Sequence, residues 1–148
     1  MTRISEAEFA RIVARQAKPE RAVATLPAPT EAQEQEAVIQ WAHMSAARLP
    51  DLRLLAAIPN GELRDKATAV RLKKTGVLAG MPDLLLAARR GGYGALFIEL
   101  KRRDRSNHAS PAQKVIHALL EEAGYRVCIA YGSEEAIVAI EGYLQLGA

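Results

Sequence analysis

Two short apolar segments carry charged side chains at a spacing that could support catalysis. The first begins at Asp83, and the second, over residues 95–101, ends with Glu99, Leu100 and Lys101. Because side chains alternate along a strand, Glu99 and Lys101 should share one face while Leu100 points to the other. If the strands pair, Asp83 approaches Glu99, and two carboxylates share a small volume with one ammonium group. Such buried charge is costly unless a partner binds it. A divalent metal is such a partner, so the cluster predicts metal-assisted cleavage of a phosphodiester.

The types of these residues favour particular ions. We expect Asp83 and Glu99 to be ligands, with the Leu100 carbonyl as a third and Lys101 beside the scissile phosphate. Hard oxygen ligands without a thiolate suit Mg²⁺ or Mn²⁺ better than zinc. An acid followed by Glu-x-Lys is a common pattern, so two strand-end acids with a surface salt bridge are the alternative interpretation.

The charge distribution is uneven along the 148 residues, although the net charge is only +3. Between Gly61 and Ser110 there are eleven Lys/Arg against five Asp/Glu, so the basic excess surrounds the acidic cluster. This surplus suits a polyanionic substrate, and a solvated basic surface is the alternative. The lone Cys128 argues against a disulfide framework or a zinc cluster. The apolar runs are too short to predict a membrane span or a signal core, so we expect a cytoplasmic protein.

Periodicity and capping residues predict alternating helices and strands. The expected helices cover residues 5–17, 31–47, 65–75, 111–123 and 133–144, with caps at Ser5, Thr30, Ser110 and Ser133. The expected strands cover residues 54–58, 83–88, 95–101 and 125–131. A tight turn at 90–92 should make the second and third strands antiparallel, and a crossover helix should make the third and fourth parallel. We therefore predict an α/β fold with a mixed central sheet flanked by helices. Residues 1–29 are interpreted as an N-terminal helix with a proline-containing linker, and 30–148 as the main domain.

Several motifs along this framework resemble those of one protein family. They are Ile58-Pro59-Asn60-Gly61, Arg64, the helix at 67–73, Gly76-Val77, Gly80-Met81-Pro82-Asp83-Leu84, Ile98-Glu99-Leu100-Lys101 and Ser110-Pro111-Ala112-Gln113. Over residues 30 to 144 the chain is similar to the virus-type replication-repair nuclease (VRR-NUC) domain of the PD-(D/E)xK superfamily, and most similar to its stand-alone phage-type members. The resemblance implies a restriction-endonuclease-like core, Mg²⁺- or Mn²⁺-dependent cutting of DNA, and homodimers.

The resemblance also implies roles for individual residues. It carries the metal ligands to Asp83 and Glu99 and the catalytic lysine to Lys101. A motif glutamine on the following helix matches Gln113, which also fits a capping box with Ser110. We expect both roles for Gln113 to be compatible.

A glutamate on the first core helix of the family lies four residues before a glutamine. Glu31 and Gln35 match this spacing, although Glu34 and Glu36 lie nearby. The alternative role of Glu31 is an acid in a first helical turn, where the helix dipole favours it. Which of the three glutamates faces the site is left open at this point.

Polar and basic residues near the cluster are candidate contacts to a DNA backbone. Asn60 and Arg64 match the phage-type pattern, with a turn asparagine and an exposed arginine as the alternative. Further candidates are Arg71, Lys73, Lys74, Arg102, Arg103 and Arg105. His117, on a helix beside apolar residues, is interpreted as a packed or surface histidine.

The sequence thus predicts a metal-dependent DNA endonuclease that is structure-selective, acting on branched DNA or junctions, or that nicks DNA. A two-fold homodimer would provide the symmetric cuts that resolve a junction. The alternative is a non-catalytic nucleic-acid-binding module with the same fold. A sugar-phosphate or nucleotide enzyme is disfavoured, because no glycine-rich turn joins a strand to a helix as a phosphate loop.

Overall fold

The computed structural model describes residues 3–16, 26–59 and 66–147. Within these ranges the helices are α1 (Glu6–Gln16), α2 (Glu31–Ser45), α3 (Lys66–Lys74), α4 (Pro111–Glu122) and α5 (Ser133–Leu144), with a 3₁₀ helix η1 (Pro50–Leu54). The strands are β1 (Leu55–Ala57), β2 (Leu84–Leu86), β3 (Leu96–Lys101) and β4 (Arg126–Tyr131). The order of the predicted helices and strands is confirmed, and η1 is an element that the sequence reading did not predict. None of the described helices combines the length and apolar character that a membrane span needs.

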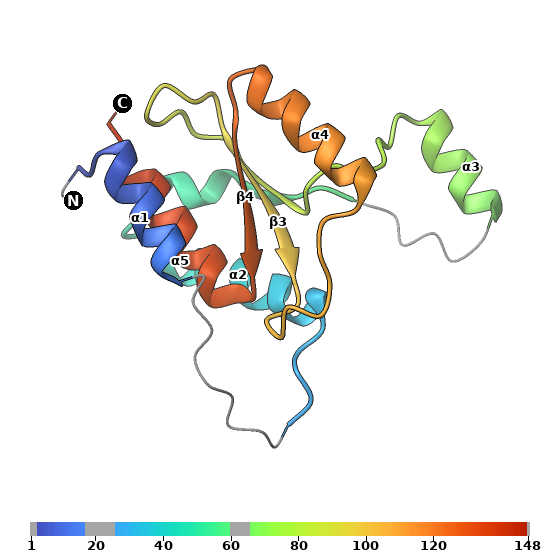
Figure 1. Ribbon diagram of the computed structural model, residues 1–148, viewed down its shortest axis with the longest axis horizontal. Coiled ribbons are helices and arrows are strands. Elements are labelled where there is room, and N and C mark those ends of the chain that lie inside the picture. The colour runs from blue at the N-terminus through green and yellow to red at the C-terminus, as the bar shows by residue number, and fades with distance from the viewer. Residues whose placement is uncertain (1–2, 17–25, 60–65, 148) are drawn as a thin grey trace.

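The strands form one sheet in the described part of the chain, in the order β1-β2-β3-β4. β2 pairs antiparallel with β1 and with β3, whereas β3 and β4 are parallel (Figure 1). Both predicted pairings are therefore confirmed. The mixed sheet, flanked by helices, gives the predicted α/β class.

β3 is the central strand of the site, and all six of its residues are buried. Leu96, Ile98 and Leu100 belong to the hydrophobic core, together with apolar residues of α2 and α5. The alternate residues, including Glu99 and Lys101, point to the face that α4 covers. One face of β3 therefore stabilises the fold, while the other carries the charged groups.

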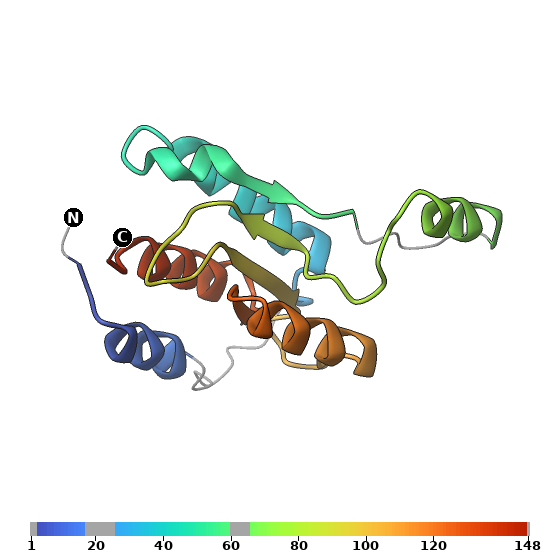
Figure 2. The same cartoon turned by 90° about the horizontal axis from the view of Figure 1, so that it is seen from above.

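The helices surround the sheet unequally. α1 lies beside α5 in Figure 1, and the Phe9 ring is so close to Gly142 that a methyl group there would lie 2.6 Å from it. α3 stands apart from the other elements at one end of the molecule, as Figure 2 shows from above. None of the described residues of α3 is buried.

Several element ends differ from the sequence prediction. β2 stops at Leu86 rather than residue 88, because the Ala88 N–H turns back to donate to the Leu86 carbonyl at 2.9 Å. The prediction that Ser133 caps the last helix is wrong: Gly132 is the N-cap, and Ser133 is the first helical residue. The N-cap has a φ of +94°, a conformation that glycine adopts without strain.

Candidate active site

Asp83 and Glu99 lie across from each other where β2 begins. Leu84 pairs with Ile98, so the register continues to Asp83 opposite Glu99. Pro82 has no N–H to extend the ladder, and Asp83 Oδ2 instead accepts a hydrogen bond of 2.7 Å from the Leu100 N–H. The side chain of Asp83 thus takes the place of a strand neighbour and is held next to Glu99. Leu100 contacts Asp83 through its N–H. That its carbonyl oxygen is a metal ligand remains a prediction.

Glu99, Lys101 and Gln113 form a closed triangle of polar contacts. Glu99 Oε1 accepts from Gln113 Nε2 at 2.6 Å and pairs with Lys101 Nζ at 3.0 Å. Lys101 Nζ also donates to Gln113 Oε1 at 3.2 Å. The same Gln113 oxygen accepts the Ser110 N–H at 2.8 Å in a complete capping box. Helix capping and contact with the acidic cluster are therefore combined in one side chain.

Burial perturbs the acids of this cluster. Glu99 is 1% exposed, and burial followed by the charge of Asp83 raises its pKa to about 7. Burial also raises the pKa of Asp83, although the Leu100 N–H and Lys101 oppose that shift. Glu31 adds a further negative charge that raises the pKa of Asp83. Lys101 neutralises only one of these carboxylates, so the cluster favours an additional cation.

The three glutamates of α2 occupy different environments. Glu31 lines the same cleft as Asp83 and Glu99 and accepts a hydrogen bond from Asn107. Glu34 is buried, and Arg103 binds both of its oxygens at 2.6 and 2.9 Å. Glu36 is exposed. The geometry thus brings Glu31, and neither of its neighbours, to the acidic cluster.

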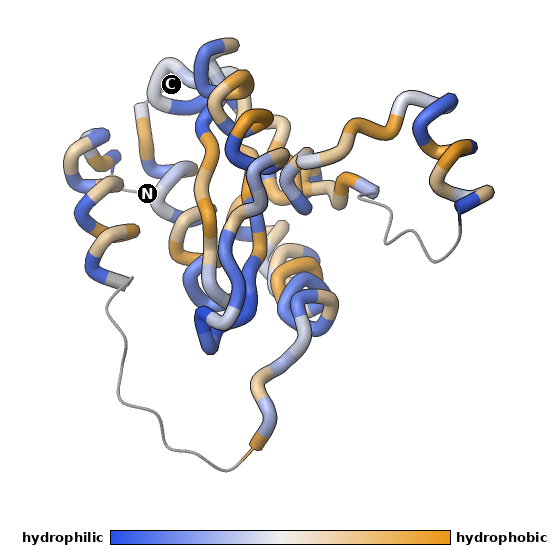
Figure 3. Tube along the Cα trace, turned by 45° about the vertical axis from the view of Figure 1, so that its right-hand side comes forward, coloured by the Kyte–Doolittle hydropathy of each residue, from blue (hydrophilic) through white to orange (hydrophobic). Residues whose placement is uncertain are grey.

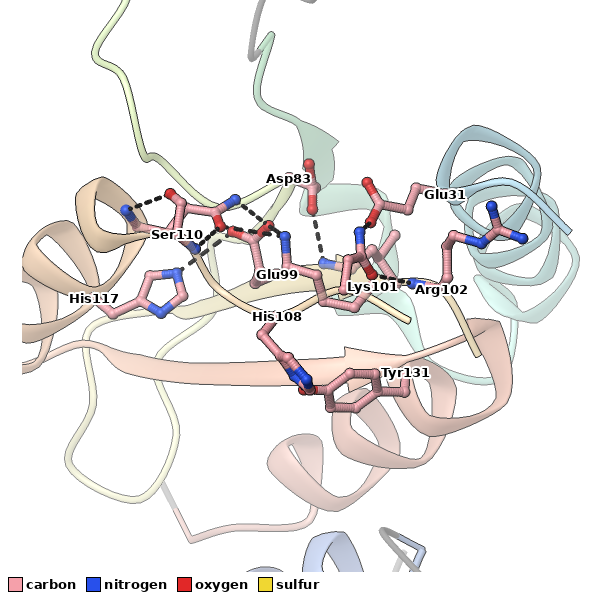
Figure 4. Close-up of polar contacts among 12 residues, drawn as sticks. Glu31, Asp83, Glu99, Lys101, Arg102, His108, Ser110, His117 and Tyr131 are labelled. Carbon is pink, nitrogen blue, oxygen red and sulfur yellow. Dashed lines mark hydrogen bonds and ion pairs between the residues drawn. The ribbon is translucent and has the colours of Figure 1, made fainter. Parts of the chain in front are cut away.

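The charged groups line a cleft of about 540 Å³ between α2, α3 and the start of α4. Figure 4 shows Asp83 above the contact between Glu99 and Lys101, with Glu31 at the right of the view. The rest of the lining is mainly apolar and includes Ala69, Leu72, Val77, Leu78, Ala79, Met81 and Ala112. The cleft therefore presents three carboxylates, of Glu31, Asp83 and Glu99, and the ammonium groups of Lys73 and Lys101 to a ligand.

Gly80 brings the segment before Asp83 against the start of α4. Its φ is +89°, and a Cβ atom there would lie 2.6 Å from the Ala112 carbonyl oxygen. Only glycine permits both the backbone conformation and this approach without strain. The close contact positions Asp83 and Gln113 on two sides of the same cleft.

The candidate DNA contacts are distributed over two segments. Arg71, Lys73 and Lys74 lie in the last turn of α3, and Lys73 lines the cleft. Asn60 and Arg64 lie outside the described residues.

The loop after β3 is held by ion pairs. Arg102 pairs with exposed Asp104 at 3.1 Å, whereas Arg103 binds buried Glu34. Arg105 pairs with Glu135 at 2.7 Å. Arg103 and Arg105 are therefore engaged in contacts within the chain.

His117, which the sequence indicated to be a packed or surface histidine, lies next to the site. It is 9% exposed on α4, and its Nε2 lies 3.4 Å from Glu99 Oε2. The signal was its spacing of four residues from Gln113, which places both side chains on one helix face.

The donor set determines which metal the residues fit. Among the described residues, no group of three or more His, Cys, Asp or Glu side chains is arranged to hold a metal ion. Asp83 and Glu99 offer two adjacent carboxylates, and buried Glu99 Oε2 has no hydrogen-bond partner in the described ranges. A hard divalent cation that takes two carboxylates and completes its shell with water fits this pair.

Comparisons with known proteins agree with this geometry. A family model described as VRR-NUC domain matches residues 14–134, which is most of the chain. A solved structure named VRR_NUC domain protein is 32% identical to this chain with a TM-score of 0.69, covering 82% of this chain and 93% of that one. No curated protein matches the chain. The predicted resemblance and fold class are confirmed, and the chain belongs to the VRR-NUC domain family, whose members are nucleases.

Proposed function

We propose that this protein is a Mg²⁺- or Mn²⁺-dependent endonuclease that hydrolyses phosphodiester bonds of DNA. The observation that carries the proposal is the buried contact between Asp83 and Glu99, with Lys101 3.0 Å from the Glu99 carboxylate. Two acids with raised pKa values beside one lysine are stabilised by a bound cation. A cleft that opens at this cluster gives a phosphate group access to it.

The side chains of the cluster divide the work. Asp83 and Glu99 would hold the ion, which when bound activates water and stabilises negative charge on the phosphate. Gln113 fixes Lys101 and Glu99 relative to each other through its two amide atoms. Lys101 then presents its ammonium group to phosphate oxygens, whose charge grows in the transition state. Glu31 adds negative charge to the cleft and so strengthens its preference for a cation.

DNA would reach the cleft along its basic margins. We assign backbone contacts to Arg71, Lys73 and Lys74 of α3 and to Arg102. Arg103 and Arg105 keep their ion pairs with Glu34 and Glu135 in this proposal. Asn60 and Arg64 remain candidates on the ground of the motif alone.

We further propose that the enzyme selects branched DNA or junctions or nicks DNA, and that it works in the cytoplasm as a homodimer. The support for the substrate preference and the dimer is the family pattern of stand-alone members, since a symmetric dimer makes two related cuts. Sedimentation analysis of the full chain tests the dimer. A monomer at micromolar concentration would contradict it.

The function is tested with labelled four-way junction, flap, nicked, linear and single-stranded DNA in Mg²⁺, Mn²⁺ or chelator. We expect cleavage only with metal, and faster cleavage of branched than of linear DNA. Asp83→Ala should abolish cleavage, and Lys101→Ala should slow it about 10²–10³-fold. Lys114→Ala, an exposed lysine of α4, is the control and should cut like wild type.

Two outcomes would count against the proposal. Cleavage that survives both Asp83→Ala and Lys101→Ala would refute the site. If the protein binds DNA but neither cleaves it nor binds Mn²⁺, the non-catalytic nucleic-acid-binding module would be favoured instead. On the same helix, Glu31→Gln should slow cleavage while Glu36→Gln should not, which tests the choice between the glutamates of α2.

A further inference from the structure

His117 approaches the Glu99 carboxylate from the side that Gln113 leaves open. The two residues are four positions apart on α4, so their side chains lie one above the other on a single helix face. Gln113 contacts Glu99 Oε1 at 2.6 Å, and His117 Nε2 lies 3.4 Å from Oε2 (Figure 4). α4 therefore presents one polar side chain to each oxygen of the same carboxylate.

The two oxygens of Glu99 differ in how they are satisfied. Oε1 accepts from Gln113 and contacts Lys101. Oε2 and His117 Nε2 are both buried, and neither has a hydrogen-bond partner within the described residues. A buried polar atom without a partner costs about 1–3 kcal/mol. Since 3.4 Å is only a few tenths of an ångström beyond hydrogen-bond length, a small shift pairs the two atoms with each other.

We propose that His117 is a positioning residue for Glu99, donating its Nε2–H to Oε2 so that α4 fixes both oxygens of the carboxylate. The inference rests on the proposed function, because it gives Glu99 the role of metal ligand. A neutral imidazole carries one N–H donor. Burial, which lowers the pKa of His117, favours that neutral form. The proton is assigned to Nε2 because that nitrogen faces the carboxylate.

The consequence is a ligand that cannot rotate. Gln113 and Lys101 both contact Oε1, so without His117 the Glu99 carboxylate is held at one oxygen only. With His117 the plane of the carboxylate is set from two points before an ion arrives. Groups that orient a metal ligand in this way typically change metal affinity about 10–100-fold when they are removed.

The experiment measures Mn²⁺ affinity by calorimetry on the full chain, without DNA. We expect His117→Ala and His117→Phe each to weaken Mn²⁺ binding about 10-fold. His117→Gln should bind more tightly than His117→Phe, because its amide N–H can replace the donor. His43→Ala, an exposed histidine on α2, is the control and should bind like wild type. The phenylalanine variant keeps the ring and its packing, so wild-type affinity in His117→Phe would overturn the proposal.

A second measurement needs no metal. In the ¹⁵N spectrum of the metal-free protein, the His117 ring should be neutral with its proton on Nε2, and Glu99→Leu should shift that signal by removing the acceptor. A proton on Nδ1, or a signal unchanged in Glu99→Leu, would overturn the role of His117. If wild type binds no Mn²⁺, the proposed function fails, while this spectrum still decides the His117–Glu99 hydrogen bond.

Discussion

The burial of Glu99 should destabilise the metal-free fold and at the same time favour the binding of a cation. Glu99 is 1% exposed, and it shares its surroundings with Asp83 and a single compensating Lys101. Placing two carboxylates in this position costs stability when no cation is bound. The same excess of negative charge is what would bind a divalent ion, so the apoprotein should be weakened by the feature that makes the site useful.

This opposition predicts how the metal-free protein depends on pH. Burial and the charge of Asp83 raise the pKa of Glu99 to about 7 in the folded chain, from an ordinary value of 4.5, so the folded state binds the proton more tightly. Stability should therefore be greatest below about pH 4.5 for this group and fall as pH rises through 7. The raised pKa of Asp83 acts in the same direction. Denaturant unfolding in chelator, measured from about pH 5 to pH 8, checks the decline.

Glu99→Gln removes the titrating group and provides the comparison for this decline. We expect its free energy of unfolding to vary less over that pH range than that of wild type. Glu122→Gln, an exposed acid at the end of α4, should behave like wild type. Equal pH dependence in wild type and Glu99→Gln would show that the charge of Glu99 is not the cause.

At this scale the sequence predicted what is local and missed what is distant. The period of two along a strand placed Glu99 and Lys101 on one face, and the hairpin brought Asp83 to them. The partner of Glu34 is Arg103, 69 positions away, and no periodicity relates two residues at that separation. His117 could have been found from its helical spacing to Gln113, but a histidine among apolar residues is more often packed than functional.

At the scale of elements, one buried carboxylate joins three segments. Glu34 of α2 binds Arg103 of the loop after β3, and it accepts the Ser133 N–H of α5 at 2.8 Å. Burial alone would raise the pKa of Glu34, but the Arg103 and Ser133 hydrogen bonds outweigh it and lower the pKa. The loop that follows Lys101 is therefore fixed against two helices.

Removing this link should destabilise the fold. Arg103→Ala leaves a carboxylate that is 1% exposed without its cation, and breaking buried pairs costs about 3–5 kcal/mol. We expect about 3 kcal/mol, the lower end, because Arg103 is partly exposed and the Ser133 N–H remains. The matched control is Arg102→Ala, whose partner Asp104 is exposed, with an expected cost below about 1 kcal/mol.

The pH dependence of unfolding tests whether Arg103 stabilises the fold through the charge of Glu34. The pKa of Glu34 is lowered in the folded chain, so its stabilising contribution is complete above the ordinary pKa of 4.5 and is lost as pH falls through the folded value. Arg103→Ala should lose less stability than wild type in that acid range. Equal losses on acidification, or equal costs for the two arginines, would contradict the role given to Glu34.

Substitutions of two glycines test whether the close contact between the segment before Asp83 and the start of α4 positions the site. Gly76 and Gly80 have φ angles of +95° and +89°, but a Cβ atom has open space at Gly76 and meets the Ala112 carbonyl at 2.6 Å at Gly80. Gly76→Ala should cost only backbone strain, about 1 kcal/mol. Gly80→Ala should add a clash of about 1–3 kcal/mol and displace Asp83 from Gln113.

Unfolding free energies and cleavage rates together check these glycine variants. We expect Gly80→Ala to lose cleavage in conditions where it is still folded, and Gly76→Ala to keep it. If both variants cut DNA at the wild-type rate, the contact with Ala112 does not position the site.

The elements themselves were largely predictable, because their signals are local. The capping boxes at Thr30 and Ser110 are both present, since a cap needs only four consecutive residues. The ends of β2 were not predicted, because they depend on where the neighbouring strands β1 and β3 stop pairing with it. η1 was missed because a short 3₁₀ turn leaves no periodic pattern.

At the scale of the whole molecule, α3 is the exception to a closely packed arrangement. It stands apart from the sheet, and Figure 3 shows hydrophilic and hydrophobic residues alternating along it. Its nine residues carry four basic side chains and no acid. Val70 on α3 and Leu78 just after it are each more than half exposed. A short helix with these properties is marginal in water, so a bound polyanion should stabilise it.

The position of α3 beside the acidic cleft predicts how DNA binding responds to salt. Each phosphate contact that is lost should reduce the slope of log K against log salt by about 0.9. Lys73→Gln/Lys74→Gln should therefore lower affinity and reduce the slope by about 2, since both lysines lie in the last turn of α3. Arg11→Gln/Arg15→Gln on α1 removes the same charge from an exposed helix beside α5 and should leave the slope unchanged. DNA affinity measured in chelator over a range of salt concentrations compares the two double variants. Equal slopes for both double variants would mean that net charge, and not the placement of α3, determines how the protein binds DNA.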